Sequence, residues 1–100
     1  MDAQDNLELA RETLQGLDRV LLFILSLRFR EILMVERIKR DLPDPAIDHP
    51  EIEAARLAEL LAKLPPRLDP EFVQNLFQLI FKESKRLQMA QRENEAPNSS

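Results

Sequence analysis

Apolar residues recur at steps of three and four through the first forty residues, which is the spacing of one stripe along a single helix. The stripe consists of Leu7, Ala10, Leu14, Leu17, Leu21, Ile24, Val35 and Ile38. No proline interrupts it, so the pattern predicts one helix over about residues 5–40, capped by Asp5 or Asn6. Such a helix is about 54 Å long, whereas a compact domain of this size has a radius of gyration of about 13 Å. We therefore expect a second copy of the chain to cover the stripe.

A second helix is expected after a loop with three prolines, at positions 43, 45 and 50, because such a run cannot continue a helix. It is predicted over about residues 49–64, because Asp48 followed by Glu51 resembles a capping box and Pro50 suits a first turn. Its inner stripe is Leu57, Leu60, Leu61 and Leu64, and its outer face is Arg56, Glu59 and Lys63. The inner stripe, extended backwards, reaches the carboxylate of Glu53.

A third helix is predicted over about residues 69–92, because Asp69 is a good N-cap and Pro70 suits the first helical position. Its apolar face consists of Phe72, Val73, Leu76, Phe77, Ile80 and Phe81, and continues to Ser84 and Gln88. The charges of residues 82–86 are expected to form a solvated face. The fold class is all-α: three helices in one domain over residues 1–92, paired as an intertwined homodimer, with a disordered tail over 93–100.

Composition excludes several classes of function. The chain has no cysteine, one histidine and one glycine, so it cannot form a thiolate site, a multi-histidine metal site or a glycine-rich phosphate loop. The net charge of −4 argues against nucleic-acid binding. The apolar run at residues 20–27 is too short to span a membrane, and the acidic N-terminus does not resemble a signal peptide. We expect a cytoplasmic protein without metal or cofactor.

Three cations stand at positions that suggest anion binding. Arg28 interrupts the apolar stripe, and Lys39 follows it by eleven residues, almost three whole turns, so both point the same way about 16 Å apart. They could clamp a small anion, or they could be cations at a dimer rim with buried stems. Arg11 lies about 25 Å from Arg28 along the helix and is rotated by about 100°, so it could reach that site only from a second chain.

The remaining off-pattern groups are two neutral hydrogen-bonding side chains, Ser84 and Gln88, and the carboxylate of Glu53. Ser84 and Gln88 taken alone could belong to a surface turn near a helix end, whereas a carboxylate that continues a leucine stripe is unusual. Together with the cations they suit a small dianion that carries a hydroxyl and another oxygen acceptor. No nucleophile–base pair accompanies them, which favours chemistry by positioning and charge stabilisation.

These residues, in this order, resemble the all-α chorismate mutases, which are small intertwined three-helix dimers. The resemblance covers about residues 7–91. It is carried by Arg11 within residues 9–18, Arg28, Lys39, Leu68 and Asp69, residues 76–80, Ser84 and Gln88. It implies the cofactor-free rearrangement of chorismate to prephenate in aromatic amino acid biosynthesis.

The resemblance also implies a role for each residue. Arg28, and Arg11 of the second copy, would bind the two substrate carboxylates, because the guanidinium fork matches carboxylate geometry. Ser84 would add a hydrogen bond to a carboxylate. Lys39 and Gln88 would donate to the ether oxygen, where negative charge grows as the C–O bond breaks.

The start of the second helix departs from the family pattern, in which two residues separate an aspartate from the pair Arg-Glu. Without gaps, Asp48 is kept as a substrate-binding residue and Arg-Glu becomes Glu51-Ile52. Shifted by one residue, Glu53 is the acceptor for the substrate hydroxyl, with Ile52 in place of arginine and His49 in place of aspartate. We prefer the shift, because it puts Glu53 on the inner face; under either register one cation is missing.

Two alternative functions remain open at this stage. An isochorismate-pyruvate lyase would use the same anion clamp on the same scaffold. A non-catalytic helical dimerisation or regulatory module would need neither the clamp nor the substrate.

Overall fold

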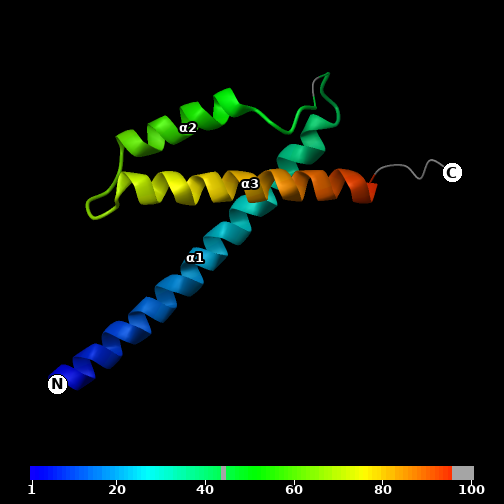
Figure 1. Cartoon of the computed structure of the whole chain (residues 1–100). Coiled ribbons are helices and arrows are strands. Elements are labelled where there is room, and N and C mark those ends of the chain that lie inside the picture. The colour runs from blue at the N-terminus through cyan, green and yellow to red at the C-terminus, as the bar shows by residue number, and fades with distance from the viewer. Residues whose placement is uncertain (44, 96–100) are drawn as a thin grey trace. The chain divides into compact units, whose positions relative to one another are not determined.

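A computed structural model describes residues 1–43 and 45–95, and every regular element within them is a helix (Figure 1). Helix α1 spans Ala3–Lys39, α2 spans Pro50–Ala62 and α3 spans Pro70–Glu95. The predicted all-α class with three helices is confirmed. The chain divides into two compact units, Met1–Glu31 and Ile32–Ser100. The predicted tail begins too early, because α3 includes residues 93–95, and residues 96–100 lie outside the described part.

Helix α1 begins two residues earlier than predicted. The carboxylate of Asp2 accepts a hydrogen bond from the backbone N–H of Asp5 at 2.9 Å, so Asp2 caps the helix and the expected cap at Asp5 or Asn6 is wrong. At the other end, the N–H groups of Asp41 and Leu42 bond the carbonyls of Ile38 and Lys39 at 3.1 and 3.0 Å. These two bonds close the last turn and end α1 at the start of the loop.

Helix α2 is capped differently from the prediction. His49 stands at the N-cap and makes no side-chain cap hydrogen bond, and Pro50 opens the helix. The expected capping box from Asp48 to Glu51 is therefore absent. The Asp48 carboxylate instead bonds the ammonium of Lys85 on α3, so an ion pair between elements has replaced a local cap.

Helix α3 starts as the sequence predicts. The Asp69 carboxylate accepts a hydrogen bond from the N–H of Phe72 at 3.0 Å, and Pro70 is the first helical residue. The buried residues are separated by steps of seven, one, three and four, which keeps them on one face of the helix: Val73, Ile80, Phe81, Ser84 and Gln88. Phe72, which was placed on the apolar face, is 57% exposed in the single chain.

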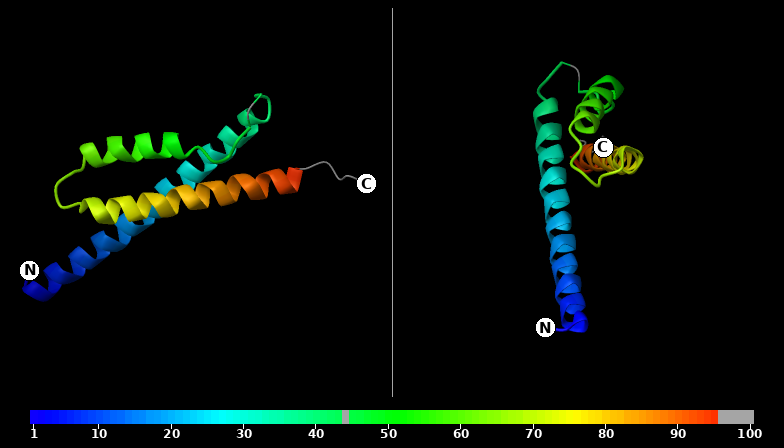
Figure 2. Two further views of the ribbon diagram at one scale, coloured as in Figure 1. Left: turned by 45° about the horizontal axis from the view of Figure 1, so that its top comes forward. Right: turned by 90° about the vertical axis from the view of Figure 1, so that its left-hand side faces the viewer.

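Within the Ile32–Ser100 unit, α2 packs along α3 and runs in the opposite direction (Figures 1 and 2). The side chains at 57, 60 and 61 of α2, and at 64 just after it, are half-buried. Those at 56, 59 and 63 are exposed, as predicted from the leucine spacing. The packing carries the start of α2 to the middle of α3. It thereby brings the carboxylates of Asp48 and Glu53 to Lys85 of α3.

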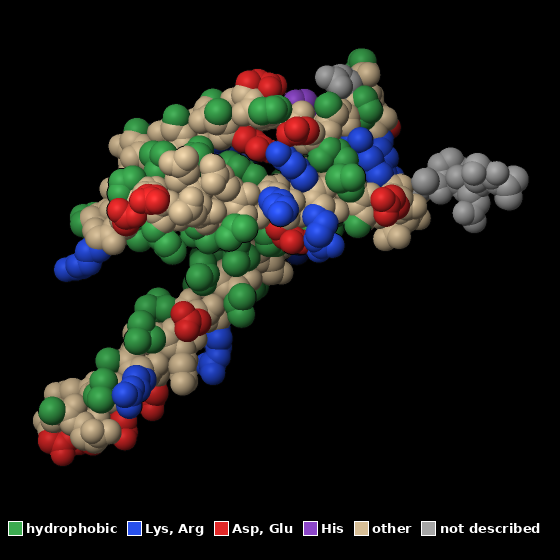
Figure 3. All heavy atoms as spheres, viewed as in Figure 1, with side chains coloured by type: hydrophobic (Ala, Val, Ile, Leu, Met, Phe, Trp, Pro, Cys, Tyr) green, Lys and Arg blue, Asp and Glu red, His purple; other side chains and the backbone are tan. Residues whose placement is uncertain are grey.

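The Met1–Glu31 unit is a helix whose apolar stripe is uncovered. Its members Leu7, Leu14, Leu17, Leu21 and Ile24 are between 44% and 59% exposed. Figure 3 shows such hydrophobic side chains on the surface of this segment. Extended apolar surface of this kind marks an interaction site in a soluble protein. No helix in the described part of the chain is long and apolar enough to cross a membrane.

Candidate active site

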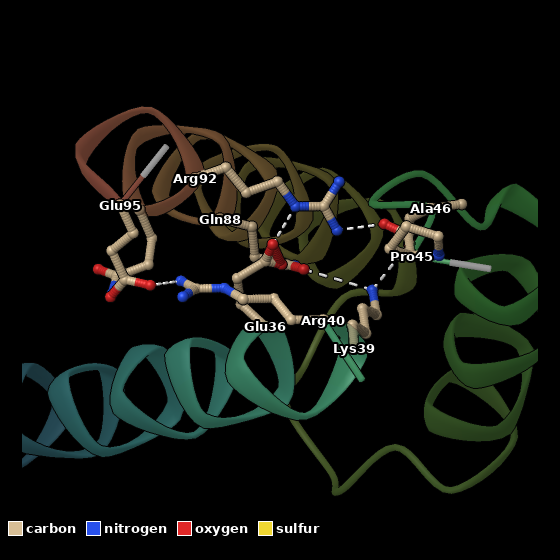
Figure 4. A network of polar contacts seen from close by, with 9 residues as sticks. Glu36, Lys39, Arg40, Pro45, Ala46, Gln88, Arg92 and Glu95 are labelled. Carbon is tan, nitrogen blue, oxygen red and sulfur yellow. Dashed lines mark hydrogen bonds and ion pairs between the residues drawn. The ribbon is translucent and has the colours of Figure 1, made fainter. Parts of the chain in front are cut away.

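Lys39 and Gln88, which are 49 residues apart in the sequence, meet in the structure (Figure 4). The Lys39 Nζ lies at the last residue of α1 and donates to the Gln88 Oε1 at 3.3 Å and to the carbonyl of Ala46 at 3.0 Å. Gln88 is 4% exposed and Lys39 is half-buried. The helix end, the loop and α3 thus fix one ammonium beside one buried amide.

The orientation of the Gln88 amide has a chemical consequence. Its oxygen accepts from Lys39, so its NH₂ group is left to donate to another group. Lys39 retains a third N–H as well, because its two bonds use only two of the three ammonium hydrogens. The pair therefore presents a positive and a neutral donor that folding has already oriented, the arrangement that stabilises developing negative charge.

A second polar link joins the same elements one helical turn away. The Arg92 Nε donates to the Glu36 Oε1, and the Arg92 Nη2 donates to the carbonyl of Pro45 (Figure 4). Glu36 has no exposed surface at all. Further out, Arg40 pairs with Glu95. The end of α1, the loop and the second half of α3 are consequently tied together by charged groups.

Ser84 lies one turn before Gln88 on the same face of α3 and is 4% exposed. Its hydroxyl donates to the carbonyl of Ile80 at 2.8 Å. In this structure the hydroxyl proton is therefore directed back to the helix. The expected hydrogen bond to a substrate carboxylate would require a change of the hydroxyl rotamer.

The predicted site residues at the start of α2 are brought together by a lysine. The Lys85 Nζ bonds the Asp48 Oδ1 at 2.9 Å and the Glu53 Oε1 at 3.0 Å. Glu53 is half-buried, as its position on the inner stripe predicts. The expectation that residues 82–86 form only a solvated face is wrong for Lys85, whose side chain is 30% exposed and bridges two helices.

A small hollow lies beside this bridge. It has a volume of about 200 Å³ and is lined by Pro50, Glu53, Ala54, Leu57, Gln78 and Phe81. A more apolar hollow of about 250 Å³ lies near the α2–α3 loop, where Leu64, Leu68 and Phe72 are among its lining residues. Of the predicted site residues, only Glu53 lines either of these hollows.

The ion pairs of Lys85 predict a specific pH dependence of stability. Hydrogen bonds to Asp48, and next to Glu53, raise the pKa of the Lys85 ammonium. Because the pKa of Lys85 is higher in the folded chain than in the unfolded chain, the charged ammonium stabilises the fold. This stabilisation is fully present below the pKa of lysine in the unfolded chain, about 10.4, and is lost as the pH rises through the pKa in the folded chain. We expect the Tm difference between the parent and Lys85→Met to be constant between about pH 7 and pH 9 and to shrink above about pH 10.5.

The control for this measurement is Lys82→Met on the same helix, because Lys82 is exposed. Its Tm difference from the parent should show no comparable decline. A Lys85→Met difference that grew with alkaline pH would contradict the assigned ion pairs.

The two predicted arginines belong to the Met1–Glu31 unit. Arg11 is exposed and Arg28 is half-buried, and both lie on α1. The other five predicted site residues lie in the Ile32–Ser100 unit. There the structure joins Lys39 to Gln88, and Lys85 joins Asp48 to Glu53. Within the described residues, no group of three acidic or histidine side chains could hold a metal ion.

Comparison with known families identifies the chain. The model of the family described as chorismate mutase type II matches residues 10–89. The chain belongs to this family. It is an isomerase of the shikimate pathway whose substrate is chorismate, and the match gives no better support to either alternative function. No curated protein and no solved structure matches the chain significantly.

Sequence reasoning missed three charged residues around the candidate active site. Lys85 lies four residues after Phe81 and eight after Phe77, so helical spacing alone places it on the inner face. Arg92 lies four residues after Gln88 in the same way. Glu36 precedes Lys39 by one turn. The signal that could have found them is the extension of an inner face through charged positions.

Proposed function

We propose that Lys39 and Gln88 form the catalytic donor pair of this chorismate mutase. The rearrangement breaks one C–O bond and forms one C–C bond within the same molecule, so no atom is gained or lost. Negative charge grows on the ether oxygen as the C–O bond breaks. The ammonium of Lys39 and the amide NH₂ of Gln88 donate to that oxygen.

The observation that carries this proposal is the hydrogen bond from Lys39 Nζ to Gln88 Oε1 beside a 4% exposed amide. The bond holds both donors before substrate arrives, so little reorganisation is needed as charge develops. Donors that interact more strongly with the transition state than with chorismate raise kcat. Neither residue needs to form a covalent bond or accept a proton.

The other predicted residues bind the substrate. Arg28 holds one carboxylate of chorismate and Arg11 of a second copy holds the other, because a guanidinium can bind a carboxylate through two parallel bonds. Ser84 adds a hydrogen bond to a carboxylate. Glu53 accepts from the substrate hydroxyl, and the contact with Lys85 holds both Glu53 and Asp48 in place.

The second copy is supported by the uncovered stripe of α1. Leu14, Leu17 and Leu21 are each more than half exposed in the single chain. Burying the exposed half of each such side chain contributes about 1 kcal/mol, which favours pairing of two identical stripes. A homodimer also places Arg11 near the active site of the second copy, because the stripe residues next to Arg11 would then lie in the interface.

The direct test is to follow chorismate loss and prephenate formation by the purified chain. Chorismate disappearance with equimolar prephenate supports the proposal, and no conversion by the folded dimer would overturn it. Parallel assays with isochorismate, measuring pyruvate and salicylate, distinguish the mutase from a lyase. Chorismate should also raise the Tm, because it binds the folded chain.

Mixing two inactive variants tests whether the site is shared. We expect Arg11→Ala and Lys39→Ala homodimers to regain activity when mixed, because some sites of the mixed dimer contain both intact residues. Subunit exchange is verified by mass spectrometry with one isotope-labelled variant. No recovery after verified exchange would place Arg11 and Lys39 in the same chain's site or remove Arg11 from it.

A further inference from the structure

Glu36 is the most buried charged residue in the described part of the chain. It has no exposed surface, and its Oε1 accepts from the Arg92 Nε. Within residues 1–43 and 45–95 its second oxygen, Oε2, has no hydrogen-bond partner. The proposed mechanism assigns neither residue a role.

Stability gives no clear reason for a buried carboxylate at this position. A buried ion pair loses hydration that its attraction barely replaces, and an unpartnered oxygen adds to that cost. A chain with neutral side chains of similar volume in place of the ion pair would often be as stable or more stable. The charge of Glu36 is therefore better explained by what it holds in place.

The contacts of Glu36 lead to Lys39 along a short chain. Arg92, which Glu36 holds, donates to the carbonyl of Pro45. The next carbonyl, that of Ala46, accepts from the Lys39 Nζ at 3.0 Å. Arg92 therefore fixes the loop segment 45–46, which in turn orients the catalytic ammonium of Lys39. Figure 4 shows Glu36, Arg92, this loop segment and Lys39 close together between α1, α3 and the loop.

Helical spacing gives Glu36 a second effect. Arg92 lies four residues after Gln88 on α3, close enough for the two side chains to interact. An arginine without its carboxylate would turn to another acceptor, and the Gln88 Oε1 is such an acceptor one turn away on the same helix. Binding there would compete with Lys39 for the Gln88 oxygen and weaken the hydrogen bond that orients the ammonium.

We infer that Glu36 is a positioning residue, which acts through Arg92 to fix the loop under Lys39 and to keep the Gln88 oxygen for Lys39. The inference rests on the proposed roles of Lys39 and Gln88. Glu36 itself does not contact chorismate, because none of its surface is accessible.

The test is Glu36→Gln, which keeps the shape of the side chain and removes its charge. We expect kcat to fall by about tenfold with KM within about threefold, because the donors act mainly in the transition state. In the Lys39→Ala background the same substitution should cost less than about twofold, since it acts through the residue already removed. A purely structural role would lower activity equally in both backgrounds.

Glu83→Gln is the matched control. Glu83 also pairs with an arginine, Arg86, on α3 at 2.6 Å, but on the surface, so its loss should leave kcat unchanged. If Glu36→Gln does not fold, the double variant Glu36→Gln/Arg92→Gln replaces both charges with amides, and the same tenfold fall in kcat is expected. Folding of each variant is checked by circular dichroism.

Three results would overturn the inference: unchanged kcat in a folded Glu36→Gln, an equal loss in the Lys39→Ala background, or an equal loss in Glu83→Gln. The proposed function fails separately. If Lys39→Ala is as active as the parent, the donor pair is wrong whatever Glu36→Gln does.

Discussion

Replacing Lys39 with alanine is expected to lower kcat by about 10²–10³-fold, the usual cost of losing one pre-organised donor. The variant loses the cation that bonds the Gln88 amide. Gln88 then loses a partner for its oxygen and can rotate. The activation barrier rises because the negative charge on the ether oxygen is then stabilised by the Gln88 amide alone, without the Lys39 ammonium. Initial rates at saturating chorismate give kcat, and circular dichroism verifies the fold.

The control variant is Lys63→Ala. Lys63 is an exposed lysine that pairs with Glu59 at 3.5 Å on the surface of α2. It removes the same charge from the chain without touching Gln88, so its kcat should equal that of the parent. A loss of less than about threefold in Lys39→Ala would remove Lys39 from the mechanism.

Introducing a carboxylate into the α1 stripe is expected to dissociate the proposed dimer and abolish activity. Leu21 is 54% exposed in the single chain and lies in the middle of the stripe. Leu21→Glu would bury one unpaired carboxylate per copy at several kcal/mol each, which raises the dissociation constant by about 10⁴-fold or more. A separated chain has no second copy to supply Arg11. Analytical ultracentrifugation and the chorismate assay, at matched concentrations, measure both effects.

Arg19→Glu is the matched control for this variant. Arg19 lies two residues earlier on the same helix, is exposed, and does not belong to the apolar stripe. It introduces the same carboxylate off the stripe, so mass and activity should remain those of the dimer. A Leu21→Glu chain with the mass and activity of the parent would show that the stripe is not the interface.

Periodicity was sufficient to predict the helices, because each one repeats its apolar positions over several turns. Helix caps depended on more than local sequence. Asp48 looks like a cap in the sequence, but Lys85 on α3 draws its carboxylate into an ion pair, and His49 takes the N-cap. Such competition depends on how α2 packs against α3, which no single segment encodes.

In the candidate site, too, some residues could be predicted from the sequence and others depended on packing. Gln88 could be predicted because a polar residue continued an apolar face, and the resemblance supplied its pairing with Lys39. Glu36 and Arg92 could not be paired from the sequence, since a charged residue on a helix is usually solvated and its partner is 56 residues away. Tertiary packing alone decides which of the many charges become buried.

Only three hydrophobic side chains are buried in the described part of a single chain: Val73, Ile80 and Phe81. A newly translated copy therefore has only a small hydrophobic core until it pairs with a second copy. On the proposed pairing, folding and assembly are one bimolecular event whose rate rises with the square of the chain concentration. A cell that made few copies would obtain disproportionately little working enzyme, and synthesis of neighbouring copies from one messenger would favour its formation.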